Sequence, residues 1–108
     1  SSKMRFTSAQ FIALLTDELW RENAKHANSM AQRLAAGVKE IPGVTITQPT
    51  QANAVFAQLP PAAIPRLQAH TPFYVWNEAR SEVRWVCSWD TTETDVAEFV
   101  AALKAELN

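Results

Sequence analysis

The chain has 108 residues, of which ten are basic and eleven acidic, so its formal net charge is −1. An apolar fraction of 47% and a charged fraction of 19% are ordinary for a globular protein and argue against disorder. The sequence has no basic stripe, so nucleic-acid binding gains no support. It also has no glycine-rich loop that could bind a phosphate. No apolar run approaches the about 20 residues of a membrane span, and no signal peptide opens the chain. We therefore expect one cytoplasmic domain with neither nucleic acid nor membrane as a partner.

The first predicted element is a long amphipathic helix that starts near Ser8 and ends near Val38. Thr7-Ser8-Ala9-Gln10 has the form of a capping box, and Pro42-Gly43 stops the pattern. Apolar side chains recur at helical spacing, namely at Phe11, Leu15, Leu19, Ala27, Met30, Ala31, Leu34 and Val38. The pattern allows one helix, or two with a break between Asn23 and Asn28.

Four strands and two further helices follow. The strands are predicted at 44–47, 53–59, 73–76 and 83–89, and the helices at 62–70 and after 90. The last helix is capped by Asp90 or an adjoining Thr, and it packs through Val96, Phe99, Val100, Leu103 and Leu107. Short loops favour antiparallel pairing, so we expect an α+β fold: a two-layer sandwich in which helices cover a small antiparallel sheet of about four strands.

The predicted sheet has aromatic side chains that cannot all face the helices. Either Tyr74 and Trp76 or Phe73 and Val75 must point away from the helices, and so must Phe56 or its neighbours. An open sheet face with several aromatic side chains usually has a partner.

Arg84 is the single charged residue of the run Val83-Arg84-Trp85-Val86-Cys87-Ser88-Trp89. Strand alternation places the odd-numbered residues of this run on a face suited to the core, and it places Glu82, Arg84, Val86 and Ser88 on the other face. A guanidinium group can bind a carboxylate or a phosphate through two parallel hydrogen bonds. Alternatively, Arg84 lies on a solvated face and pairs with Glu78 or Glu82.

The residues provide no catalytic constellation. Cys87 falls on the core face, so it is predicted to be a buried, inert thiol, and as a lone cysteine it excludes an internal disulfide. His26 and His70 lack the spacing of metal ligands. Asp90 and Glu93 could form a pair of carboxylates, but their positions at the cap and in the first turn of the last helix account for both acids. We therefore predict no catalytic residue, no metal site and no cofactor site on this chain.

Four blocks resemble the C-terminal part of the low-specificity L-threonine aldolase family, in the right order and with matching spacing. They are residues 2–10, 20–28, 51–56 and 83–92. The family consists of pyridoxal-phosphate (PLP) enzymes of the aspartate-aminotransferase fold, fold type I, which cleave β-hydroxy-α-amino acids such as threonine to glycine and an aldehyde. The resemblance implies that residues 1–108 are a single C-terminal small domain of a larger enzyme. The abrupt start at Ser1 agrees with a truncated chain.

In this family the Schiff-base lysine, the phosphate-binding loop and the cofactor-stacking histidine belong to the large domain. Lys3, Lys25, Lys39 and Lys104 do not match the family's lysine motif. The resemblance therefore implies PLP in the full-length enzyme, no cofactor bound to this fragment, and an isolated chain without activity. The implied partners are the large domain, an amino-acid substrate and further copies in a homo-oligomer.

One functional residue of the family has a counterpart in this sequence. Val83-Arg84-Trp85-Val86, with Asp90 following, matches the family strand whose Arg binds the substrate α-carboxylate. The resemblance thus assigns substrate binding to Arg84. Cys87-Ser88 stands where many relatives have Thr-His, so the chain follows a different branch. Two alternatives of other classes are a stand-alone module that binds an amino acid and a structural module that dimerises through its open sheet face.

Overall fold

The computed structural model describes residues 17–107. Its elements in chain order are α1 (Asp17–Val38), β1 (Thr45–Ile46), β2 (Ala54–Gln58), α2 (Ala63–His70), β3 (Tyr74–Asn77), η1 (Glu78–Arg80), β4 (Glu82–Val86) and α3 (Glu93–Leu107). The predicted order of helices and strands is confirmed for these residues. The expected capping box at residues 7–10 and the start of the first predicted helix lie outside the described residues.

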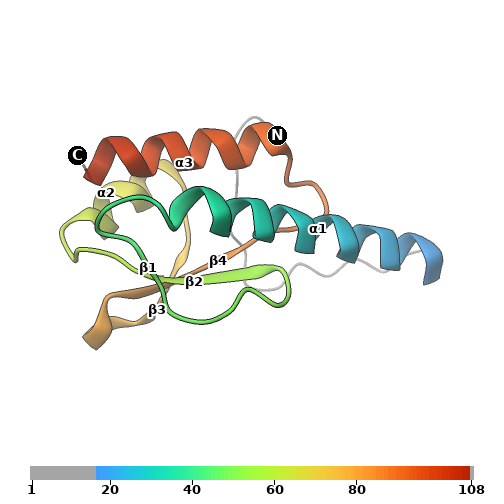
Figure 1. Ribbon diagram of the computed structural model, residues 1–108, viewed down its shortest axis with the longest axis horizontal. Coiled ribbons are helices and arrows are strands. Elements are labelled where there is room, and N and C mark those ends of the chain that lie inside the picture. Colours follow the sequence, from blue (N-terminus) through green and yellow to red (C-terminus); the bar gives the residue numbers. More distant parts are fainter. Residues whose placement is uncertain (1–16, 108) are drawn as a thin grey trace.

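The strands form one antiparallel sheet in the order β1-β2-β4-β3. β4 is therefore a central strand, paired with β2 on one side and β3 on the other. In Figure 1, α1 and α3 run side by side over one face of the sheet, and α2 lies beside the C-terminal end of α3. The fold is the two-layer α+β sandwich that the element order predicts.

Helix α1 is continuous from Asp17 to Val38, so the break considered near Asn23 does not occur. Its buried stripe consists of Ala27, Met30, Ala31, Leu34 and Val38, as the helical spacing predicts. Leu19, expected on the same stripe, is instead 41% exposed. The first turns of α1 extend beyond the ends of the strands (Figure 1), so they do not pack on the sheet as the later turns do.

Trp85 lies at the centre of the core and is the largest of the fully buried side chains among the described residues. Its ring makes edge-to-face contacts with Phe99 of α3, at 5.0 Å between centroids, and with Phe73 just before β3, at 6.1 Å. Such pairs add to the free energy gained by burial. Trp85 therefore connects the central strand with the helix layer.

The strand prediction was too long at its C-terminal end. β4 ends at Val86, and Trp89, which we expected to face the core, is 47% exposed. The Ser88 amide donates to Thr91 Oγ1 at 2.9 Å, and the Ser88 hydroxyl donates to Asp90 Oδ1 at 2.6 Å. These local side-chain bonds offer the backbone an alternative to the sheet ladder and turn the chain toward α3.

Of the two predicted caps for the last helix, the neighbouring threonine is the one observed. The Asp95 amide donates to Thr92 Oγ1 and the Thr92 amide donates to Asp95 Oδ2, each at 3.0 Å, which is a reciprocal capping box. Asp95 is buried for this reason, although it was expected away from the packed side of the helix.

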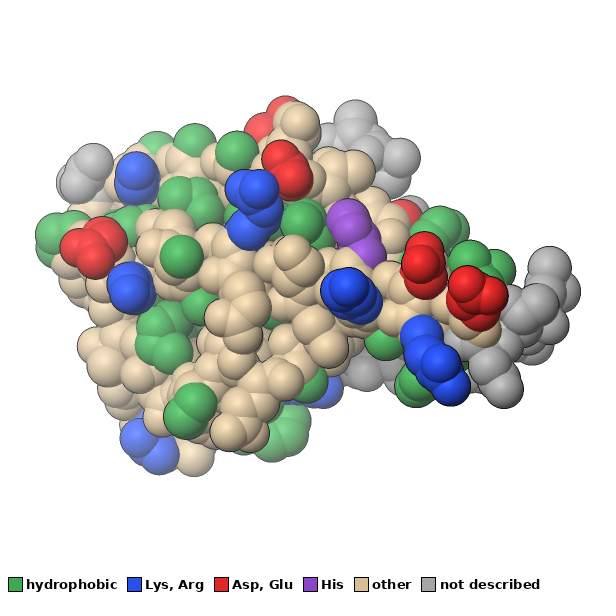
Figure 2. All heavy atoms as spheres, turned by 45° about the vertical axis from the view of Figure 1, so that its right-hand side comes forward, with side chains coloured by type: hydrophobic (Ala, Val, Ile, Leu, Met, Phe, Trp, Pro, Cys, Tyr) green, Lys and Arg blue, Asp and Glu red, His purple; other side chains and the backbone are tan. Residues whose placement is uncertain are grey.

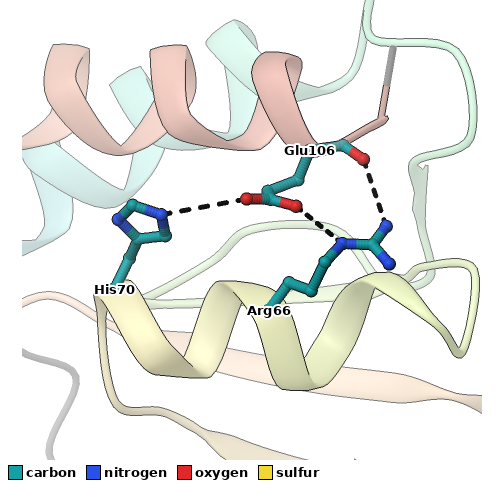
Figure 3. A network of polar contacts seen from close by, with 3 residues as sticks. All are labelled: Arg66, His70 and Glu106. Atoms are coloured by element: carbon teal, nitrogen blue, oxygen red, sulfur yellow. Dashed lines mark hydrogen bonds and ion pairs between the residues drawn. The ribbon is translucent and has the colours of Figure 1, made fainter.

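A polar network joins α2 to the last turn of α3 (Figure 3). Arg66 Nε donates to Glu106 Oε1 at 2.7 Å, and His70 Nε2 lies 3.8 Å from Glu106 Oε2. The other histidine, His26, has its Nε2 within 2.5 Å of the Thr91 carbonyl oxygen. Both histidines thus have structural partners, and residues 17–107 contain no cluster of side chains suited to a metal ion.

In Figure 2, acidic and basic side chains are interspersed over the visible face, so this face has no extended patch of one sign. Within residues 17–107, no helix combines the length and the apolar character needed to cross a bilayer.

Candidate functional site

Arg84 lies in the middle of the central strand and faces away from the helices. Its neighbours in sequence, Val83 and Trp85, are fully buried in the core, so strand alternation directs Arg84 to the opposite, open face of the sheet. Its partners across the ladder are Phe56 of β2 and Tyr74 of β3. The guanidinium is therefore presented on a surface whose backbone is held by hydrogen-bonded strands on both sides.

Two aromatic rings hold the Arg84 guanidinium. Its Cζ lies 5.4 Å from the ring centroid of Trp76 and 6.0 Å from that of Phe56, both within the range of cation–π attraction. The two rings also contact each other edge to face, with centroids 5.2 Å apart and an interplanar angle of 75°. Because β2 and β3 flank β4 and are about 10 Å apart, the rings must extend toward each other above β4.

The nearest acid in sequence on this face does not pair with Arg84. Glu82 is only 4% exposed, and its Oε2 accepts a hydrogen bond from Thr47 Oγ1 at 2.5 Å. The ion pair with Glu78 or Glu82 that we considered as an alternative is absent, and no carboxylate within residues 17–107 pairs with Arg84. Arg84, which is partly buried, thus has no ion-pair partner among these residues.

The open face is the one expected to carry aromatic side chains. Of the two possibilities considered, Tyr74 and Trp76 are the pair that points away from the helices, at 52% and 55% exposure, while Phe73 is buried. Phe56 shares this face with them. The sequence predicts aromatic side chains on this face, but nothing in it identifies Phe56 and Trp76 as the contacts of Arg84.

The lysines lie away from this face. Lys25 and Lys104 are exposed on α1 and α3, and Lys39 is exposed directly after α1, all on the helix layer. Arg84 is on the other side of the sheet. Residues 17–107 therefore place no lysine beside Arg84. Lys3 lies outside the described residues.

Cys87 is buried, as predicted. Burial away from water disfavours the thiolate and raises the pKa of Cys87 to about 12. Near neutral pH the side chain is therefore a neutral thiol and cannot serve as a nucleophile.

We expect Cys87 to resist alkylation in the folded protein. At pH 8 the thiolate fraction is very small and the sulfur is covered, so labelling by iodoacetamide should be at least about 100-fold slower than for an exposed cysteine. Mass-spectrometric mapping of the modified residue measures this rate. The same protein in denaturant is the control and should be labelled fully, whereas rapid labelling in the native state would contradict the burial of Cys87.

The sequence of this chain is similar to those of known proteins. No family model matches the chain. The chain is 39% identical over 108 residues to a low-specificity L-threonine aldolase from a Pseudomonas species, and 38% identical over 104 residues to the one from Pseudomonas aeruginosa. These matches cover 100% and 96% of the chain. They cover 31% and 30% of the relatives, so the chain spans less than a third of their length.

Solved structures have the same fold. A threonine aldolase from Leishmania major superposes with a TM-score of 0.73 at 28% identity, over 85% of this chain and 28% of that one. The glycine decarboxylase (P-protein) of the glycine cleavage system gives a TM-score of 0.72 at 26% identity, over 83% of this chain and 22% of that one. A C-DES mutant with glycine covalently linked to its PLP cofactor gives 0.66 at 18% identity, over 78% and 24%, which indicates the fold alone.

The sheet and helices of residues 17–107 are thus those of the small C-terminal domain of fold-type-I PLP enzymes. Within this class, both the sequence identity over the whole chain and the superposition of the structures point to threonine aldolases. The chain is similar over its whole length to low-specificity L-threonine aldolases and shares the fold of a threonine aldolase, which agrees with a C-terminal domain of that family.

Proposed function

We propose that the chain is the C-terminal domain of a PLP-dependent carbon–carbon lyase that cleaves threonine to glycine and acetaldehyde, and that Arg84 binds the α-carboxylate of the amino acid. The observation that supports this proposal most directly is the environment of the Arg84 guanidinium. Its guanidinium is on the open face, contacts two rings, and is paired with no carboxylate of residues 17–107. The family relationship supports the choice of reaction.

The role of Arg84 is to orient the substrate. Two parallel N–H···O bonds from one guanidinium fix both the position and the plane of a carboxylate, which a lysine ammonium cannot do. The strand pairing on both sides of β4 and the rings of Phe56 and Trp76 restrict the guanidinium before the substrate arrives. Less freedom is then lost on binding, so more of the interaction energy contributes to orientation.

The cofactor and the reacting groups belong to a second domain in this proposal. The matched relatives are more than three times as long as this chain, which leaves ample sequence for such a domain. The exposed aromatic surface formed by Tyr74 and Trp76 fits contact with that domain around the substrate. Homo-oligomer formation and a cytoplasmic location stay predictions.

Activity should require the second domain. We expect the full-length protein loaded with PLP to release acetaldehyde from threonine, and we expect the 108-residue chain mixed with PLP to release none and to develop no absorbance band of lysine-bound cofactor. An assay coupled to acetaldehyde reduction and a visible absorption spectrum measure the two results. Lys39→Ala in the isolated chain is the control for non-specific reaction at a surface lysine.

Three outcomes would contradict the proposal. A full-length protein that does not cleave threonine would exclude the reaction. Binding of glycine or threonine to the isolated chain with millimolar or tighter affinity would favour a stand-alone amino-acid-binding module. A concentration-dependent dimer of the isolated chain, lost on replacing Tyr74, would favour a dimerisation module.

A further inference from the structure

We propose that Trp76 is a positioning residue: together with Phe56, it keeps the Arg84 guanidinium away from Glu82, so that Arg84 stays available to a carboxylate from outside the domain. This inference rests on the proposed function of Arg84 and adds a second residue to it.

Glu82 and Arg84 would otherwise be expected to pair. They are two residues apart on one strand, so their side chains leave the same face of β4 about 7 Å apart. Both side chains are long enough to close that distance. Attraction between opposite charges is strong where water is largely excluded, and Glu82 is 4% exposed. The absence of an ion pair between them therefore needs a structural cause.

The first cause acts on the carboxylate. Thr47 lies beside β2, where its amide donates to the Phe56 carbonyl oxygen at 3.0 Å. From there its hydroxyl reaches Glu82 Oε2 at 2.5 Å. Since β2 lies between β1 and β4 in the sheet, this bond draws the Glu82 carboxylate across β2, toward the β1 edge.

The second cause acts on the guanidinium. β3 has a register shift between Val75, which pairs with Val83, and Asn77, which pairs with Glu82, so Trp76 is the extra residue of a bulge. Bulges change the direction of a side chain, and here the Trp76 ring meets the Phe56 ring above β4. The Arg84 guanidinium lies on this ring pair, closer to Trp76 than to Phe56. Removing Trp76 would release Arg84 toward Glu82.

The test is a titration of the full-length, PLP-loaded protein with glycine, followed by calorimetry. Trp76→Ala should weaken glycine binding about fivefold or more, because Arg84 is then released toward Glu82, which competes with the glycine carboxylate for the guanidinium. Trp76→Phe retains a ring and should stay within about twofold of the unmodified protein. The double variant Trp76→Ala/Glu82→Gln should recover to within about twofold, because the competing charge is gone.

Matched controls distinguish this mechanism from general damage. Trp20→Ala removes an equally exposed tryptophan from α1 and should leave glycine affinity within about twofold. Trp76→Ala/Glu78→Gln removes a different acid near Arg84 in sequence and should stay as weak as Trp76→Ala. Rescue by Glu78→Gln in place of Glu82→Gln, or no rescue by Glu82→Gln, would overturn the inference.

The two proposals can fail separately. If Arg84→Ala weakens glycine binding but Trp76→Ala does not, the positioning role of Trp76 is overturned and the carboxylate role of Arg84 stands. If Arg84→Ala itself leaves glycine affinity unchanged, the proposed function of Arg84 fails first, and the role of Trp76 fails with it.

Discussion

Arg84→Ala in the full-length enzyme is expected to lower kcat/KM for threonine by about 100- to 1000-fold, with the affinity for PLP unchanged. If Arg84 binds the substrate carboxylate as proposed, the variant removes two charge-assisted hydrogen bonds, together worth about 3–4 kcal/mol. A factor of ten corresponds to about 1.4 kcal/mol, which gives the stated range. Steady-state kinetics measure the first quantity, and a titration of the apoprotein with PLP measures the second.

Two further variants test whether the loss is specific to the guanidinium group of Arg84. Arg84→Lys keeps the charge without the planar pair of donors, so we expect it to recover only part of the loss. Arg80→Ala removes an exposed cation from the neighbouring turn η1 and should change kcat/KM less than twofold. Unchanged kinetics for Arg84→Ala would reject Arg84 as the carboxylate-binding residue.

Trp85→Ala should have the largest effect on stability. The side chain is fully buried and contacts Phe73 and Phe99, so its removal leaves a cavity between β4 and α3. Substitutions of this kind cost about 3–5 kcal/mol in the free energy of unfolding. Denaturant unfolding followed by circular dichroism measures this loss. A domain of this size has limited stability, so the variant should be largely unfolded at 37 °C.

Trp89→Ala is the matched control for Trp85→Ala. Trp89 is 47% exposed and lies in the turn after β4, so its replacement should change the free energy of unfolding by about 0.5 kcal/mol or less. Similar losses for the two variants would contradict the assignment of Trp85 to the core and of Trp89 to the surface.

Arg84 and Trp85 are neighbouring residues whose side chains leave opposite faces of β4. Trp85 anchors the central strand to the helices, and Arg84 projects from the other side of the same strand. The position of the guanidinium therefore depends on the packing of the core directly behind it. A variant that loosens Trp85 without unfolding the domain should also weaken the orientation of Arg84.

The sequence by itself determined the order of elements, the α+β class and the faces of the central strand. It could do so because helical and strand periodicity are local properties: side chains at spacings of three and four, or of two, reveal which face is buried. It also singled out Arg84, through one cation in an uncharged strand and through the resemblance of the surrounding blocks to threonine aldolases.

The tertiary structure alone decided where β4 ends and what surrounds Arg84. The apolar pattern continues to Trp89, but the hydrogen bonds of Ser88 end the strand at Val86 and leave Trp89 exposed. Arg84 meets Phe56 and Trp76, which come from the strands on either side of β4, and Glu82 is bound by a threonine beyond β2. These contacts depend on strand order, register and a bulge, which are set by long-range pairing and leave no local signal in the sequence.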